Sequence, residues 1–287
     1  MKELVIISGK GGTGKTSLTA CFTFLARDKV LADCDVDAAD LHILAHPKTL
    51  HKEDFRGGAK AKIDAERCSK CGICKESCRF GAISAEFVVS RLSCEGCGVC
   101  FHVCPERAVS LEETTNGQWF VSETRFGPMV HAALHPGEEN SGKLVALVRN
   151  QAKVVARELS KSLILVDGAP GVGCPVISSI TGADRVLIVT EPTLSGLHDM
   201  KRAMQLSQGF GIPVAVVINK FDINLDVTEQ IEKFSVKAGA RVVGKIPYDP
   251  EVIRAMVQRR CVLENGNSPA SIAIREIWER LEPSLSS

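Results

Sequence analysis

The chain has 287 residues, of which 45% are hydrophobic and 24% charged, and 35 basic and 34 acidic residues give a net charge of +1. This length fits about two domains. The balanced charge and the 5% aromatic content give no electrostatic or base-stacking case for nucleic acid as a partner. No apolar run approaches the roughly 20 residues that span a bilayer, and the N-terminus lacks a signal peptide. We therefore expect a cytoplasmic protein without a stable membrane anchor.

Short apolar runs alternate with amphipathic segments along most of the chain. Buried strands are predicted at 4–7, 30–33, 163–166, 186–189, 214–218 and 241–245. Helices are predicted at 17–27, 143–160, 195–207, 226–238, 251–259 and 269–281. We expect 41–55 to be helical and then irregular, 118–122 to be a strand that re-enters the main sheet, and 127–142 to be loop. This alternation indicates an α/β fold, with a mostly parallel sheet and helices on both faces.

A glycine-rich loop lies between the first predicted strand and the first predicted helix. Residues 9–16 fit the motif G-x4-G-K-[ST] in the strand–loop–helix context that it requires. We predict ATP and Mg²⁺ as cofactors, because backbone N–H groups at a helix N-terminus bind phosphates, Lys15 can reach the β- and γ-phosphates, and Thr16 can bind Mg²⁺. The predicted nucleotide-binding residues of the loop are Gly11, Gly12, Thr13, Gly14, Lys15, Thr16 and Ser17.

Eight of the twelve cysteines lie in two copies of the spacing C-x2-C-x2-C-x3-C. This spacing is typical of bacterial ferredoxins with two [4Fe–4S] clusters, in which the fourth cysteine of each run binds the other cluster. The predicted ligands are therefore Cys68, Cys71, Cys74 and Cys104 for one cluster, and Cys94, Cys97, Cys100 and Cys78 for the other. The alternatives are structural zinc, which prefers two C-x2-C pairs with a longer spacer, and disulfides, which are rare in the cytosol.

The cysteine runs form an internal repeat that begins at Cys68 and again at Cys94, and it interrupts the α/β pattern. We predict a discontinuous P-loop ATPase domain at 1–59 and 114–287, and an inserted α+β domain of the bacterial ferredoxin type at 60–113. The cysteines outside the runs are interpreted as small buried hydrophobic residues. They are Cys21, Cys34, Cys174 and Cys261.

Because residue 10 is a lysine, the loop also fits the more specific motif K-G-G-x-G-K-[ST], the deviant Walker A loop. With this loop the chain resembles the MinD/ParA/Mrp and nitrogenase-iron-protein group of P-loop ATPases, over Met1–Leu41 and Trp119–Leu281. The resemblance implies a homodimer, or a heterodimer with a related ATPase, in which Lys10 reaches the partner's nucleotide as a catalytic residue. The alternative is that Lys10 contacts the phosphates bound by its own chain.

The acidic segment after the second predicted strand resembles switch I of this group. The resemblance implies that Asp33 lies near the Mg²⁺ ion and that Asp35 orients the attacking water. Asp37 and Asp40 in the same segment are interpreted as loop carboxylates or a helix cap.

Three later segments also follow predicted strands and resemble nucleotide-binding loops of the group. By resemblance, Asp167 holds Mg²⁺ through water as in Walker B, and the N–H of Gly171 senses the γ-phosphate as in switch II. Asn219 would contact adenine, and Pro247 belongs to a loop that packs on the base. Proline is also an ordinary turn residue, so the last assignment has the weaker sequence signal.

A cysteine module inserted between switch I and Walker B closely resembles one subgroup, the MinD-superfamily ATPases with an inserted ferredoxin domain. Residues 135–145 and 191–199 resemble this subgroup as well. The resemblance implies a redox protein, or a protein that carries or assembles a metal–sulfur cofactor, as the partner.

Two departures from better-known relatives limit the comparison. The nitrogenase iron protein binds one cluster between subunits through two cysteines from each. Cys174 lies where one of these ligands falls, but 127–142 offers no counterpart for the other, so a plain buried thiol is the better interpretation. MinD ends in a basic amphipathic membrane helix, whereas 272–281 is amphipathic but charge-balanced, which favours packing in the core.

Three functional hypotheses follow. The first is an ATPase that couples an ATP-dependent dimer switch to electron transfer or metal-cofactor maturation on a partner. The second is a MinD/ParA-like assembly or positioning ATPase in which the clusters are structural. The third is an iron–sulfur cluster carrier that resembles Mrp.

Overall fold

The computed structural model describes residues 1–138 and 142–285, which fold as two compact units. The first unit contains Met1–Glu53, Trp119–Ala133 and Asn140–Ser287, and the second contains Asp54–Gln118 and Leu134–Glu139. The predicted domain boundaries near residues 60 and 113 fall inside two long strands, because these strands pass from one unit to the other without a loop. Part of the segment 135–145, at 139–141, lies outside the described residues.

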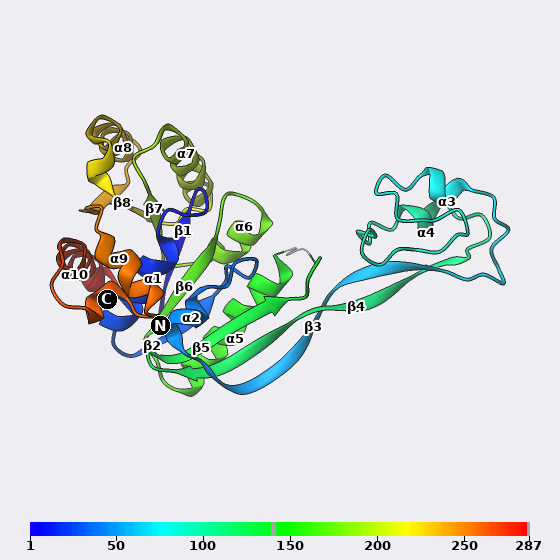
Figure 1. Cartoon of the computed structure of the whole chain (residues 1–287), viewed down its shortest axis with the longest axis horizontal. Coiled ribbons are helices and arrows are strands. Elements are labelled where there is room, and N and C mark those ends of the chain that lie inside the picture. Colours follow the sequence, from blue (N-terminus) through cyan, green and yellow to red (C-terminus); the bar gives the residue numbers. More distant parts are fainter. Residues whose placement is uncertain (139–141, 286–287) are drawn as a thin grey trace. The chain divides into compact units, whose positions relative to one another are not determined.

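One nine-stranded sheet has the order β3-β4-β5-β2-β6-β1-β7-β8-β9 (Figure 1). Its strands are β1 (Lys2–Ser8), β2 (Lys29–Asp33), β3 (Lys48–Ile63), β4 (Val109–Thr124), β5 (Gly127–Leu134), β6 (Leu163–Pro170), β7 (Arg185–Thr190), β8 (Val214–Asn219) and β9 (Arg241–Ile246). The neighbours from β5 through β9 in this order pair in parallel. Only two residues join β4 to β5, which suits antiparallel neighbours. The predicted α/β fold with a mostly parallel sheet is confirmed.

Helices cover both faces of this sheet. They are α1 (Lys15–Leu25), α2 (Leu41–Ala45), α5 (Lys143–Glu158), α6 (Cys174–Ile180), α7 (Leu194–Gly209), α8 (Leu225–Lys237), α9 (Pro250–Val257) and α10 (Pro269–Leu281). Leu4 and Ile6 of β1 join the core beneath α1 and α10, and Val5 and Ile7 are equally buried although their side chains point to the opposite face. Among the described residues, no helix combines the length and apolar character that crossing a bilayer requires.

The last helix, α10, packs into the core, as its charge balance predicts. The ring of Trp278 lies 5.2 Å from that of Phe22 on α1, measured between centroids. Burying an aromatic or aliphatic side chain of this size contributes about 1.5–3 kcal/mol. This contact fixes the helix that follows the glycine-rich loop.

The prediction for 41–55 was largely wrong. Helix α2 ends at Ala45, and the residues from Lys48 onward form the strand β3. His46 takes a left-handed conformation with φ 52°, and Pro47 follows it. A proline cannot continue the helical hydrogen bonds, so the helix stops there.

The prediction of loop for 127–142 was wrong in its first half. Residues Gly127–Leu134 form β5, which pairs with β2 through Met129 and Val130. Pro128 is tolerated because it lies near the start of the strand. The sequence analysis also missed helix α6, which is short and begins directly after a glycine-rich turn.

The second unit contains the same short backbone motif twice. Its helices α3 (Ile73–Glu76) and α4 (Val99–Val103) each follow a left-handed glycine, Gly72 with φ 87° and Gly98 with φ 77°. A small core of Ala61, Ala82, Cys94 and Val109 lies between the two halves. The internal repeat of the sequence is therefore also a repeat of conformation.

His131 on β5 is a titrating group in the first unit. Its ring stacks on Phe120 with centroids 4.9 Å apart, and its Nε2 lies 2.9 Å from Ser122 Oγ. Burial, helped by the nearby His42, lowers the pKa of His131 from 6.5 to about 4. Between these two values the unfolded chain binds more protons than the folded one, so stability is lost as the pH falls through this window.

When the pH falls from about 7 to about 4, we expect the free energy of unfolding of the wild-type protein to fall by about 2 kcal/mol more than that of His131→Gln. This figure is reduced because the ring is partly exposed. Urea denaturation of both proteins at each pH measures this difference. An equal loss in the two proteins would contradict the assignment.

Candidate functional site

The glycine-rich loop connects β1 to α1, and its glycines are required sterically. Gly14 has φ 89°, and a Cβ atom there would lie 2.3 Å from Asn219 Nδ2. The same Nδ2 donates a 2.8 Å hydrogen bond to the carbonyl oxygen of Thr13. Asn219 ends β8, so the strand that carries the predicted adenine contact also supports the loop.

A buried cluster of charged side chains lies beside the loop. Lys15 Nζ lies 2.9 Å from Asp167 Oδ1 and 3.2 Å from Asp35 Oδ2. The Thr16 hydroxyl donates to Asp167 Oδ2 at 2.8 Å, and the Thr19 hydroxyl donates to Asp167 Oδ1 at 2.8 Å. The loop and the segments that resemble switch I and Walker B thus meet at the ammonium group of Lys15.

The sheet explains why these segments meet. β2 and β6 are parallel neighbours, and Asp33, the last residue of β2, is paired with Asp167 in the second half of β6. Both side chains are fully buried. Asp33 Oδ2 has no hydrogen-bond partner within the described part of the chain. A buried and unpartnered carboxylate oxygen favours an additional ligand at this point.

The pKa shifts of the cluster indicate the sign of that ligand. Burial alone would lower the pKa of Lys15, but the carboxylates of Asp167 and Asp35 outweigh burial and raise it. Burial raises the pKa of Asp33, and the neighbouring Asp167 raises it further. Burial also raises the pKa of Asp35. Three carboxyl groups share one ammonium group, so a further cation is electrostatically favoured here.

The donor set fits Mg²⁺. The Thr16 hydroxyl and the carboxylates of Asp33 and Asp167 are oxygen ligands, which this ion prefers, and Mg²⁺ keeps several waters or phosphate oxygens besides its protein ligands. Within residues 1–138 and 142–285, no group of three or more His, Cys, Asp or Glu side chains is placed to hold a metal ion by itself. A Mg²⁺ ion here would depend on the nucleotide for part of its coordination.

A pocket of about 400 Å³ extends from the loop along α1. The predicted residues that line it are Gly11, Gly12, Gly14, Lys15, Thr16, Ser17, Asp35, Asn219 and Pro247. Tyr248, which follows Pro247 in the predicted base-packing loop, lines the same pocket, as does Met256, which the sequence analysis missed. Met256 accepts a hydrogen bond from Ser17 Oγ through its sulfur at 2.9 Å. The N–H of Gly171 donates to the Ser8 carbonyl oxygen at 2.8 Å, a bond that must break before this N–H can contact a phosphate.

Lys10 does not point to the buried carboxylates. Its Nζ lies 2.7 Å from Glu191 Oε1 and 3.0 Å from Ser195 Oγ. Lys220 Nζ approaches the other carboxylate oxygen of Glu191 at 3.6 Å. Glu191 directly follows β7, the neighbour of β1, and that position was the available sequence signal for this contact.

The eight cysteines of the repeat line two separate cavities in the second unit. Cys68, Cys71, Cys74 and Cys104 line one, and Cys78, Cys94, Cys97 and Cys100 line the other. The fourth cysteine of each run therefore lines the cavity of the other run. Each cavity is lined by four thiols, the number of ligands that a [4Fe–4S] cluster takes, although in the described part of the chain no group of three or more such side chains is placed to hold a metal ion as it stands.

Backbone N–H groups point at three of these sulfur atoms. Ala61, Ala82 and Ala108 donate to Cys94 Sγ at 3.5 Å, Cys78 Sγ at 3.4 Å and Cys104 Sγ at 3.3 Å. Such hydrogen bonds stabilise thiolates and tune the potential of a bound cluster. The sequence spacing could not reveal these donors.

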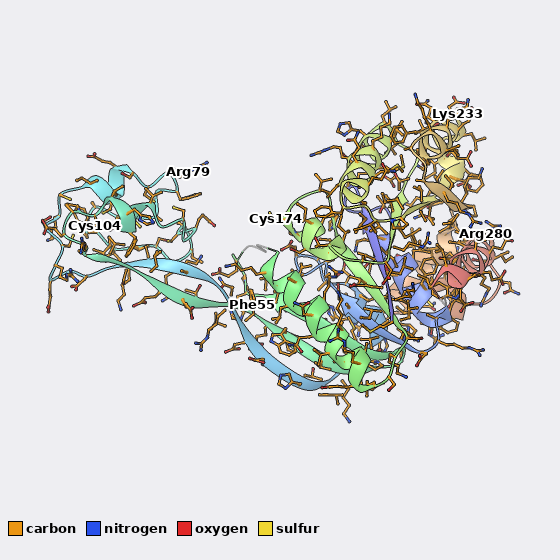
Figure 2. The ribbon with its side chains drawn as sticks, turned by 180° about the vertical axis from the view of Figure 1, so that it is seen from behind. Phe55, Arg79, Cys104, Cys174, Lys233 and Arg280 are labelled. Carbon is orange, nitrogen blue, oxygen red and sulfur yellow. The ribbon has the colours of Figure 1, made fainter. Side chains whose placement is uncertain are left out.

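The remaining cysteines differ from one another. Cys21, Cys34 and Cys261 are buried as predicted, and the side chains of Cys21 and Cys261 share a hydrogen bond. The interpretation of Cys174 as a buried residue was wrong, because it is exposed at the start of α6 (Figure 2). A helix that begins at an exposed turn leaves its first side chain in solvent.

The chain belongs to the CobQ/CobB/MinD/ParA nucleotide-binding domain family, whose family model matches residues 4–261. An uncharacterized protein of Methanocaldococcus jannaschii is 32% identical over 285 residues, which cover 98% of this chain and 96% of that protein. An iron–sulfur cluster carrier protein of Pyrococcus abyssi is 27% identical over 136 residues, or 42% of this chain and 45% of that protein.

Solved structures of cell-division ATPases share the fold. MinD in the MinC:MinD complex of Aquifex aeolicus matches with a TM-score of 0.58 and 19% identity, and covers 99% of this chain and 96% of that one. MinD from Pyrococcus horikoshii in complex with Mg-ADP matches with a TM-score of 0.57 and 15% identity, over 98% and 96% of the chains. At these identities the match shows the fold alone.

Proposed function

We propose that this chain is an ATP-binding and ATP-hydrolysing iron–sulfur protein in which an ATP-dependent dimer switch controls electron transfer, or metal-cofactor maturation, on a partner protein. The observation that carries the proposal is the pairing of two features. A P-loop site of the MinD/ParA type shares the chain with two cavities, each lined by four cysteines.

The nucleotide part of the proposal rests on the buried cluster. Lys15 is held by Asp35 and Asp167, so bound phosphates would compete with these carboxylates for its ammonium group. Mg²⁺, held by Thr16, Asp33 and Asp167, would neutralise phosphate charge. Once Lys15 turns to the phosphates, Asp35 is free to orient a water molecule. The approach of ATP would in this way change the position of switch I.

The redox part rests on the cysteine module. Bound clusters would supply one-electron chemistry, and the chain's own residues bind, orient and shield them. The module is inserted after switch I, and a nucleotide-driven change in that segment would therefore reach the strand that leads into the module.

The iron content of the purified protein tests the clusters. We expect eight irons and eight acid-labile sulfides per chain after anaerobic reconstitution. The double variant Cys97→Ser/Cys100→Ser should lose the cluster of its cavity and about half of the iron, because two of four thiolates are removed. The control Cys174→Ser should keep all of it. Zinc in place of iron, or a full iron content in the double variant, would contradict this part of the proposal.

Lys10 supplies a test of the dimer switch. In the free chain it is bound to Glu191, whereas the proposed role requires it to reach the partner's nucleotide. Glu191→Gln removes the competing charge and should tighten ATP-dependent dimerisation about fivefold, as expected from a partly exposed ion pair worth about 1 kcal/mol. Sedimentation with a non-hydrolysable ATP analogue measures the change, and Glu229→Gln in an exposed pair is the control. Weaker dimerisation of Glu191→Gln would contradict the proposed release of Lys10.

An iron–sulfur carrier is the second candidate function, and the Pyrococcus abyssi relative favours it. A carrier must release its cluster. Incubation of the loaded protein with an apo-ferredoxin separates the two functions. Retention of both clusters supports the switch, and transfer to the acceptor supports the carrier.

A further inference from the structure

Lys60 is a buried lysine that contacts Cys94, a residue of one of the two cysteine cavities, and it also lines a wider, more open cavity that Cys68 of the first run reaches. The residue is only 8% exposed, and among the described residues Lys15 is the one other buried lysine. Lys60 Nζ donates a 2.9 Å hydrogen bond to the carbonyl oxygen of Cys94 and lies 3.4 Å from Glu138 Oε1. Asn116 in turn holds Glu138 by a short hydrogen bond. The ammonium group is therefore fixed beside a predicted cluster ligand.

The strand β3 packs closely on the second cysteine run. Next to Lys60, the N–H of Ala61 donates to Cys94 Sγ at 3.5 Å. On the other side of Lys60, Ala59 packs against Gly96. A Cβ atom added at Gly96 would lie 2.0 Å from the carbonyl oxygen of Ala59, so no side chain fits there. Three consecutive residues of β3 thus contact the loop that begins at Cys94.

The first cysteine run lacks this arrangement. The position equivalent to Gly96 is Lys70, which takes the same left-handed conformation with φ 56° but has an exposed side chain. A charge in solvent is screened, whereas a charge in the interior acts through a lower dielectric constant. The two halves of the repeat therefore differ in their electrostatic surroundings, although their cysteine spacing is identical.

We propose that Lys60 makes the two clusters unequal, by raising the reduction potential of the cluster bound through Cys94 above that of the other. The proposal rests on the proposed function, because it requires both clusters. Reduction transfers one electron from an external reductant to the cluster, adds one negative charge and breaks no bond. A buried ammonium group stabilises that added charge, and Glu138 weakens the effect. An electron that enters the module then resides on the cluster of Cys94.

A redox titration with dithionite, monitored by electron paramagnetic resonance, tests this inference on the full-length reconstituted protein. Wild type should show two reduction steps. Lys60→Met should disfavour one step about tenfold, which is about 59 mV for one electron, and Glu138→Gln should shift the same step in the opposite direction. The control Lys70→Met removes an exposed charge beside the first run and should shift either step by much less.

The outcomes separate the inference from the proposed function. Fewer than eight irons in wild type would count against the clusters themselves. Eight irons together with equal shifts of both steps, or with no shift in Lys60→Met, would overturn the role of Lys60. If Lys60→Met fails to retain a cluster, Glu138→Gln decides, because it keeps the lysine and must raise one step alone.

Discussion

Lys15→Met is expected to lower the free energy of unfolding by about 3–5 kcal/mol and to abolish ATP binding, because it leaves buried carboxylates without their counter-ion. Lys15 is 6% exposed, and it contacts Asp167, whose side chain is fully buried, and Asp35. Denaturant unfolding of the nucleotide-free protein measures the loss directly. Because burial raises the pKa of Asp35, this carboxyl group is protonated as the pH falls, and the loss should shrink toward low pH.

Two comparisons make this expectation specific to the buried cluster. Lys233→Met removes an exposed lysine of α8, paired with Glu229, and should change stability by at most about 0.5 kcal/mol (Figure 2). Adding Asp35→Asn to Lys15→Met should restore part of the stability, because one uncompensated charge is removed. An unchanged unfolding midpoint in Lys15→Met would show that Lys15 does not neutralise the cluster.

Asp35→Asn is expected to reduce ATP turnover about 10²–10⁴-fold, the range for loss of a group that positions or deprotonates the nucleophile. The substitution preserves the shape of the side chain. Asp35 contacts Lys15, the residue predicted to reach the phosphates, with its Oδ2 3.2 Å from Lys15 Nζ. Affinity for Mg-ADP should therefore stay within about threefold of wild type, a difference below 1 kcal/mol. Single-turnover hydrolysis and calorimetric binding separate these two effects.

The control for this expectation is Asp226→Asn. Asp226 is exposed in the first turn of α8 and does not line the pocket. Its substitution should leave turnover near that of wild type. If both variants hydrolyse ATP at the wild-type rate, another residue positions the water.

Local sequence was sufficient to predict the elements whose chemistry is local. The loop from Gly9 to Thr16 and the spacing of the cysteine runs specify their own backbone conformations, down to the left-handed Gly14, Gly72 and Gly98. The buried strands of the parallel sheet were likewise visible as apolar runs. Such features depend on neighbours in the chain and can be read without knowing the sheet order.

Features that depend on sheet order could not be predicted from the sequence. Glu191 meets Lys10 because β7 lies next to β1. Asp33 meets Asp167 because β2 lies next to β6, and only the family resemblance placed both at one ion. β3 and β4 were missed or shortened because their many polar residues give little strand periodicity, and β5 was missed because Gly127 and Pro128 favour a loop. In the sheet, β3 pairs with β4 and β5 pairs with β2, and each of these pairs joins segments far apart in sequence. The burial of Lys60 was not predicted either, because charged residues are expected at the surface.

The most direct test of the proposed switch compares the cluster potentials of one protein in two nucleotide states. The reconstituted protein is titrated with dithionite in the presence of Mg-ADP and of a non-hydrolysable ATP analogue, and the reduction steps are followed by electron paramagnetic resonance. The account predicts that the analogue promotes dimerisation and shifts at least one step, and that Lys10→Ala abolishes the shift. Clusters that titrate identically in both states, while the analogue is demonstrably bound, would contradict the coupling of ATP to the redox module.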